Sequence, residues 1–219
     1  MKPRVKICCI KDENEASMAI EFGASALGLV GEMPSGPGVI PDEDIRNIAR
    51  KVSPPVATFL LTSKTKANDI ISHHQLVHTN TIQIVDQLTE GNYQDIRNAL
   101  PGIKLVQVVH VMGEESIDEA LAIAEEVDAI LLDSGNPGLS TKVLGGTGKT
   151  HNWKISRKLV ETVKVPVFLA GGLSPENVKK AINEVQPFGL DLCSGVRTDD
   201  RLDPVKLEKF FEAVYNTSR

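Results

Sequence analysis

Cysteine is scarce in this sequence, and long hydrophobic runs are missing from it. The 219 residues include three cysteines, an odd number that argues against a disulfide framework and for a reducing, cytoplasmic location. The longest apolar runs, such as residues 24–30, fall far short of the ~20 residues of a membrane-spanning helix. The basic first residues are followed by no apolar segment or cleavage site of a secretion signal. We therefore expect a cytoplasmic protein without a membrane partner.

An excess of positive charge is also missing. The chain carries 24 Lys and Arg against 29 Asp and Glu, which gives a formal net charge of −5. Because proteins that bind nucleic acid display a basic surface, we expect no nucleic-acid partner. Any anionic ligand must be held by local donors. The composition that is present, 41% hydrophobic and 24% charged, is typical of a globular protein with a large core.

No sequence repeat is present, but short β-branched runs alternate with amphipathic stretches along the chain. The predicted strands are residues 5–10, 24–30, 55–61, 81–85, 104–110, 129–132, 165–170 and 189–193. The predicted helices are residues 12–22, 42–51, 65–74, 92–100, 114–126, 153–163, 175–185 and 204–215. Ser174 and Asp203 each precede a proline, a pattern typical of helix starts, and they support the last two helices.

Eight strands that alternate strictly with eight helices predict a single (β/α)8 TIM barrel, one domain over residues 1–219. The alternative is an open doubly wound sheet, but such sheets usually have fewer strands, and no G-x-G-x-x-G motif follows the first strand. Catalytic residues of these barrels lie at the carboxyl ends of the strands. Here those ends carry polar residues and glycines, namely Cys8, Cys9, Gly31, Glu32, Thr62, Ser63, Asp86, His110, Asp133, Gly171, Gly172, Ser194 and Gly195.

Three glycine clusters, residues 145–149, 170–173 and 193–196, are candidates for a phosphate site. Glycine lets backbone N–H groups approach a ligand, and (β/α)8 barrels often bind phosphate after strands 7 and 8. The first cluster is not a P-loop, because Val143 stands where that motif begins with glycine. The alternative is that the glycines only shape turns. The predicted phosphate-binding residues are Gly146, Gly148, Gly171, Gly172, Ser194 and Gly195.

Two adjacent cysteines lie near the end of the first predicted strand. Strand side chains alternate between faces, so we expect Cys8 and Cys9 to point to opposite sides. A thiol has an ordinary pKa of about 8.5 and needs a cationic neighbour to react at neutral pH. Lys6 lies on the same predicted face as Cys8 and is a candidate for that neighbour. The alternative is that Cys8 is a small buried hydrophobic residue.

Five stretches together resemble the phosphoribosylanthranilate isomerase family of tryptophan biosynthesis: residues 6–8, 131–133, 145–153, 170–178 and 191–196. The resemblance implies a (β/α)8 barrel that uses no cofactor and converts an aminoaldose to an aminoketose by an Amadori rearrangement. It implies that Asp133 is the general acid that protonates the furanose oxygen, and that Cys8 is the general base that removes the C2′ proton. The glycine clusters correspond to the family's phosphate cradle.

The chain departs from the family pattern at several positions. The family usually has glycine where Cys9 stands, and an arginine after the second strand that would pair with the anthranilate carboxylate; residues 33–39 contain no arginine. The loop after the sixth strand, residues 134–144, is longer than usual, and His110 replaces a residue that tends to be small. We therefore expect a divergent member with an altered substrate, or one in which Arg197 binds the carboxylate. The substrate-binding candidates are Lys6, Asp86, His110, Asp191 and Arg197.

Two other functions stay open. Asp86, His110 and Asp133 end successive predicted strands and could bind Zn²⁺, Mn²⁺ or Fe²⁺, as in a metal-dependent phosphosugar epimerase or aldolase, although no second strand-end histidine supports this. The other is a barrel that binds a phosphorylated metabolite without catalysis. For the isomerase we expect a small phosphorylated sugar-amine substrate, no metal, and a monomer or homodimer.

Overall fold

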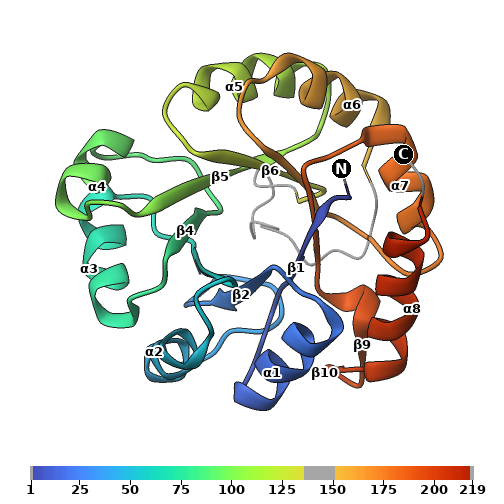
Figure 1. Ribbon diagram of the computed structural model, residues 1–219. Helices are drawn as coiled ribbons and strands as arrows, with labels where there is room; N and C mark the ends of the chain where they lie inside the picture. The colour runs from blue at the N-terminus through green and yellow to red at the C-terminus, as the bar shows by residue number, and fades with distance from the viewer. Residues whose placement is uncertain (1, 136–150, 218–219) are drawn as a thin grey trace.

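Eight parallel strands close into a barrel with helices outside it, which confirms the predicted fold (Figure 1). The computed structural model describes residues 2–135 and 151–217. The barrel strands are β1 (Arg4–Ile7), β2 (Ala26–Val30), β3 (Ala57–Thr62), β4 (Thr81–Ile84), β5 (Lys104–His110), β6 (Ala129–Asp133), β7 (Val167–Leu169) and β8 (Gly189–Leu192). The helices are α1 (Glu13–Phe22), α2 (Asp42–Lys51), α3 (Ala67–Val77), α4 (Tyr93–Ala99), α5 (Glu115–Ala124), α6 (Trp153–Thr162), α7 (Val178–Val185) and α8 (Pro204–Tyr215).

The strands pair in sequence order, and β1 pairs with β8 to close the sheet. Alternate strand residues face opposite sides, so the barrel has two apolar layers. Leu60, Ile82 and Leu132 belong to the layer between strands and helices. Phe59 and Phe168 belong to the layer inside the barrel, where their rings meet edge to face at 6.0 Å. No helix among residues 2–135 and 151–217 is long and apolar enough to cross a membrane.

Side-chain caps fix several helix starts. The Asp203 carboxylate accepts hydrogen bonds from the backbone of Val205 and Lys206 and begins α8 at Pro204, as the sequence predicts. The predicted start of α7 at residue 175 is wrong by three residues, since the helix begins at Val178. Residues 175–177 form a turn instead, and within it the Asn177 amide donates to the Gly172 carbonyl oxygen.

The first strand is shorter than predicted, and this changes where its cysteines lie. β1 ends at Ile7, so strand alternation does not extend to Cys9. Cys9 has a left-handed backbone with φ of 61°. The prediction that Cys8 and Cys9 point to opposite sides is wrong, because both side chains line one pocket.

A short hairpin follows the last barrel strand. A 3₁₀ turn, η1 (Ser194–Val196), leads into β9 (Arg197–Thr198), which pairs antiparallel with β10 (Arg201–Leu202). Asp199 and Asp200 join the two strands with φ values of 48° and 60°. Figure 1 shows β9 and β10 between α1 and α8, so the hairpin brings the end of the barrel sheet against its first helix.

Candidate active site

A pocket opens at the carboxyl ends of the barrel strands. The space inside it, including the part that is open to solvent, is about 780 Å³. Its lining comprises Cys8, Cys9, Val30, Met33, Ser35, Gly36, Pro37, Leu61, Gln83, Val85, Val108, Leu131, Asp133, Ala170, Gly171, Gly172, Leu173, Asp191, Leu192, Cys193 and Ser194. The mouth of the barrel therefore gathers a thiol, a carboxyl group and two glycine-containing loops, as the strand ends predict.

Cys8 follows β1 and is buried in the pocket wall with its side chain lining the cavity. Its backbone N–H donates to the Leu192 carbonyl oxygen at 2.8 Å, which continues the β1–β8 pairing and fixes the residue. A hydrogen bond with Cys9 lowers the pKa of Cys8, and the charge of Lys6 acts in the same direction, against the effect of burial. The alternative of an inert buried residue does not account for a thiol with these neighbours at a pocket wall.

Lys6 and Asp191 form an ion pair inside the barrel. The Lys6 Nζ lies 2.8 Å from Asp191 Oδ1 and is fully buried. It also lies 5.3 Å from the centre of the Phe59 ring, a cation–π distance. Burial alone would lower the pKa of Lys6, but Asp191 and Cys8 outweigh it and raise the pKa. Asp191 lines the pocket whereas Lys6 does not, so Lys6 acts on the site as a fixed positive charge beneath it.

Asp133 ends β6 and faces the same pocket as Cys8. Burial raises the pKa of Asp133, and a hydrogen bond from the Ser134 backbone together with the charges of His110 and Lys6 offsets this only in part. A carboxyl group with a raised pKa keeps its proton closer to neutral pH, which suits a general acid. β1 and β6 are three steps apart around the closed sheet, by way of β8 and β7, so the two groups approach the cavity from different sides.

The loops after β7 and β8 both contribute to the lining of the pocket. Gly171 and Gly172 have φ of 82° and 63°, conformations that favour glycine, and both line the cavity beside Ser194. Gly195 does not line it, but a Cβ at this position would fall 2.0 Å from the Leu173 carbonyl oxygen. Glycine is therefore required for the two loops to pack together. Gly146 and Gly148 lie outside the described residues.

Gln83 in β4 is a pocket residue that the sequence reasoning missed. It is buried, and its Oε1 has no hydrogen-bond partner among the described residues, although it lines the cavity. A buried unpaired acceptor is rare and is available to a ligand hydroxyl group. A polar residue in an otherwise apolar, β-branched run was the signal that could have found it.

His110 and Asp86 lie in an adjoining pocket. Val85 and Val108 line both cavities, and His110 pairs in strand register with Asp133. The His110 ring lies with Nε2 3.2 Å from the Val85 carbonyl oxygen, while Nδ1 has no partner in the described parts of the chain. Within those parts, no group of three His, Cys, Asp or Glu side chains could hold a metal ion.

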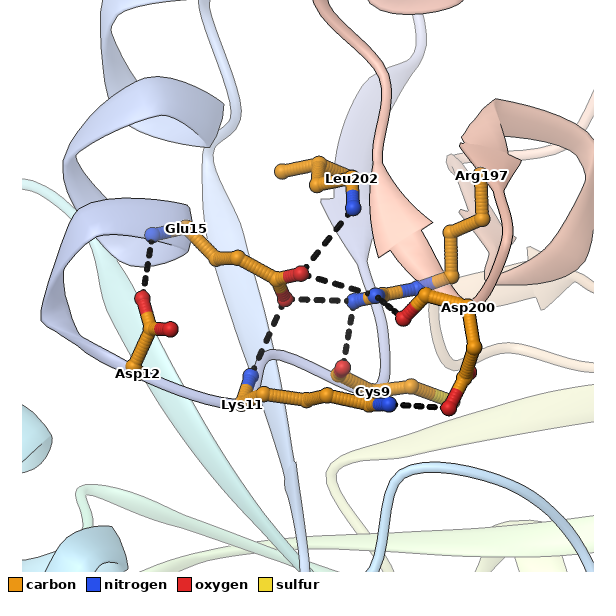
Figure 2. Close-up of polar contacts among 7 residues, drawn as sticks. All are labelled: Cys9, Lys11, Asp12, Glu15, Arg197, Asp200 and Leu202. Atoms are coloured by element: carbon orange, nitrogen blue, oxygen red, sulfur yellow. Dashed lines mark hydrogen bonds and ion pairs between the residues drawn. The ribbon is translucent and has the colours of Figure 1, made fainter.

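The predicted role of Arg197 at the substrate carboxylate is not supported by its position. Arg197 is buried and does not line the pocket. Its guanidinium nitrogens lie 2.7 and 2.9 Å from the Glu15 carboxylate and also contact the Cys9 carbonyl oxygen (Figure 2). The sequence reasoning missed this pairing because Glu15 and Arg197 are 182 residues apart.

Comparison with known proteins agrees with this geometry. Residues 5–213 match the family model of N-(5′-phosphoribosyl)anthranilate (PRA) isomerase. A relative of that name from Methanothrix thermoacetophila is 34% identical, over 96% of this chain and 97% of its own. The crystal structure of phosphoribosyl anthranilate isomerase from Thermotoga maritima has a TM-score of 0.79 at 30% identity, covering 97% of this chain and 98% of that one.

A second solved structure of this kind contains a ligand. It is phosphoribosyl anthranilate isomerase in complex with reduced 1-(o-carboxyphenylamino)-1-deoxyribulose 5-phosphate, with a TM-score of 0.76, 27% identity, and coverage of 97% of this chain and 98% of that one. The resemblance predicted from five short stretches thus extends over nearly the whole chain and its fold. The chain belongs to the N-(5′-phosphoribosyl)anthranilate isomerase family.

Proposed function

We propose that this protein, as a monomer or homodimer, isomerises N-(5′-phosphoribosyl)anthranilate in tryptophan biosynthesis, with Asp133 as general acid and Cys8 as general base. The observation that carries the proposal is that the two side chains line one pocket, bordered by the glycine loops after β7 and β8. The family membership supports the reaction, and the directions of the two pKa shifts support the division of roles.

The reaction needs one proton donor and one proton acceptor. Asp133 protonates the furanose oxygen as the nitrogen lone pair forms a C=N bond and the ring C–O bond breaks. The Cys8 thiolate then takes the C2′ proton, and the released electron pair forms a C1′=C2′ enol with a neutral amine. Tautomerisation returns a proton to C1′ and converts the C2′ hydroxyl to a ketone. No electrons are gained or lost overall.

The rest of the pocket suits the two ends of such a substrate. We assign phosphate binding to the backbone of Gly171 and Gly172 and the hydroxyl of Ser194, which line the pocket together. We assign a sugar hydroxyl to Gln83 Oε1, which has no partner among the described residues. On the β2–α2 side, Met33 and Pro37 present apolar surface to an aromatic ring. This side carries no arginine, so we propose ring packing there in place of a cationic clamp.

The direct test is to offer phosphoribosylanthranilate to the purified protein and follow the loss of its fluorescence. We expect isomerisation by the unmodified protein and a fall in kcat of at least about a hundredfold in Asp133→Asn and in Cys8→Ala, the contribution typical of a positioned acid or base. Asp118→Asn, an exposed carboxylate on α5, is the matched control and should keep full activity. Full activity in both Cys8→Ala and Asp133→Asn would refute the assignment of roles.

Absence of activity in the unmodified protein would have a different meaning. It would contradict phosphoribosylanthranilate as the substrate and direct the test to other phosphorylated aminoaldoses, with the same two variants. Loss of activity on such a substrate in Asp133→Asn would retain the acid–base roles and replace only the group attached to the sugar amine.

A further inference from the structure

The loop between β1 and α1 holds a non-glycine residue in a conformation that side chains rarely adopt. Cys9 has φ of 61°, in the left-handed region, directly after the candidate base Cys8. This conformation is disfavoured for residues with a Cβ and persists where surrounding contacts enforce it. Contacts on two sides of Cys9 enforce it.

One enforcing contact comes from the far end of the chain. The Arg197 Nη2 group donates to the Cys9 carbonyl oxygen, and the guanidinium is itself held by Glu15 (Figure 2). The Glu15 carboxylate also accepts hydrogen bonds from the backbone of Lys11 at 3.1 Å and Leu202 at 2.9 Å. Both charged side chains are buried. This pair, called here the Arg197–Glu15 clamp, joins the β1–α1 loop to the β9–β10 hairpin.

Cys9 is confined on its other side by the β2–α2 loop. Gly38, with φ of 82°, packs so closely that a Cβ there would fall 2.4 Å from the Cys9 Cβ. With its carbonyl oxygen held by Arg197 and its Cβ against Gly38, Cys9 has little freedom to rotate. Its side chain lines the pocket beside Cys8.

Three cysteines meet at this wall of the pocket. Cys193, the residue after β8, and Cys8 both act on the Cys9 thiol, and all three residues line the cavity. These neighbours, together with burial, raise the pKa of Cys9 well above its ordinary value, whereas Cys9 lowers the pKa of Cys8. The two directions are those expected where Cys9 keeps its proton beside a Cys8 thiolate, because a hydrogen bond to a charged form favours that form.

We propose that Arg197 and Cys9 are positioning residues for Cys8: Arg197 fixes the Cys9 backbone, and Cys9 then donates its S–H to the Cys8 sulfur in its thiolate form. The proposal rests on the proposed role of Cys8 as the base and adds how that base is kept ready. The charges of Lys6 from β1 and Asp191 from β8 also act on Cys8, and Asp133 from β6 and Cys193 after β8 line the same pocket. All of them stay unchanged in the test below.

The test measures the thiolate directly, without isomerase turnover. The rate of alkylation of Cys8 by iodoacetamide is followed against pH under a phosphine reductant, with the modified residue identified by tandem mass spectrometry. The midpoint of this pH dependence, called here the Cys8 midpoint, reports where the Cys8 thiol ionises. We expect it to rise by about one pH unit or more in Cys9→Ala and in Arg197→Met. Cys9→Ser keeps a donor at this position and should shift the midpoint less than Cys9→Ala does.

Controls separate positioning from folding. Arg97→Met removes another ion-paired arginine, whose partner Asp128 lies at 2.9 Å just before β6, and should leave the Cys8 midpoint unchanged. Because Arg197→Met leaves the buried Glu15 charge unpaired, the double variant Arg197→Met/Glu15→Leu provides a second measurement with both charges removed. Its Cys8 midpoint should also rise.

An unchanged Cys8 midpoint in Cys9→Ala would overturn the role of Cys9, and one in the folded double variant would overturn the role of Arg197. Failure of the proposed function has a separate signature. Full isomerase activity in Cys8→Ala would remove Cys8 from the reaction but leave the alkylation result, and hence the hydrogen-bond arrangement, standing.

Discussion

At the scale of single residues, the site depends on charges that are buried in pairs. Lys6 is fully buried, and its attraction to Asp191 offsets its desolvation only while both partners are present. Arg197 and Glu15 follow the same rule on the other side of β1. Two ion pairs therefore flank Cys8, one inside the barrel and one outside it.

Replacing Lys6 tests this dependence. Lys6→Met leaves Asp191 as an uncompensated charge inside the barrel, and we expect the free energy of unfolding to fall by about 3–5 kcal/mol. Urea denaturation followed by circular dichroism measures it. The matched control is Lys104→Met, whose exposed Nζ lies 2.9 Å from Asp128, and it should cost less than about 1 kcal/mol. Equal losses in the two variants would contradict the importance of burial.

Strand position predicted which residues reach the pocket in several cases but not in all, since Gly195, predicted to bind phosphate, does not line it. Cys8, Asp133, Gly171 and Ser194 line the pocket because the strand ends of a parallel barrel meet at one mouth, a rule that requires only local strand assignment. Arg197 was expected near the substrate, but its position depends on Glu15 at the other end of the chain. No local sequence pattern indicates a contact between residues so far apart in the chain.

At the scale of elements, a local start signal predicted the right boundary for α8 but not for α7, which begins three residues after the position that Ser174 and Pro175 indicate. α2, α8 and β5 have the predicted bounds, and α8 has a capping aspartate followed by proline. β1 ends three residues early because Cys9 adopts a left-handed backbone, which the apolar pattern through residue 10 does not reveal. The β9–β10 hairpin was missed because strands of two residues are too short to show alternation.

The contact between the loops after β7 and β8 gives a prediction at this scale. Gly195→Ala would place a Cβ 2.0 Å from the Leu173 carbonyl oxygen, so the two loops must separate and the glycine backbone beside Ser194 must shift. We expect KM for the phosphorylated substrate to rise about tenfold, equivalent to about 1.4 kcal/mol of binding. Steady-state kinetics, with inorganic phosphate as a competitive inhibitor, measure the effect.

Gly113→Ala is the control for this change. A Cβ at Gly113 would also meet a close neighbour, but that neighbour is the flexible carboxylate of Glu115, which can move aside. KM should stay within about twofold of the unmodified protein, a difference of less than 0.5 kcal/mol in binding. An unchanged KM in Gly195→Ala would remove the loop after β8 from phosphate binding.

At the scale of the whole molecule, stability in acid should depend on the Arg197–Glu15 clamp. Hydrogen bonds and charge from Arg197, with backbone donors, outweigh burial and lower the pKa of Glu15 from its ordinary value of 4.5. A carboxylate whose folded pKa is depressed stabilises the protein above the unfolded pKa, and this contribution is lost as pH falls through the folded pKa. Glu15→Gln should therefore be less stable than the unmodified protein at pH 7, with the difference shrinking below about pH 4.5.

Urea denaturation at pH 7 and at pH 3.5 measures this change. Glu13→Gln, which removes an exposed partner of Lys51, is the control and should have only a small effect at pH 7. A stability difference between Glu15→Gln and the unmodified protein that is the same at pH 7 and at pH 3.5 would show that the clamp does not depend on ionised Glu15.

Closure of the sheet has one more consequence. Because β1 pairs with β8, residues near the two ends of the chain are neighbours, and the Lys2 Nζ donates to the Tyr215 carbonyl oxygen at 2.6 Å. A ring of repeating β/α units has no intrinsic first member. A short linker could therefore join the segment before β1 to the segment after α8, and the chain could be cut at another loop. In such a circular permutant the Cys8 region becomes an interior segment, and every contact between elements is retained.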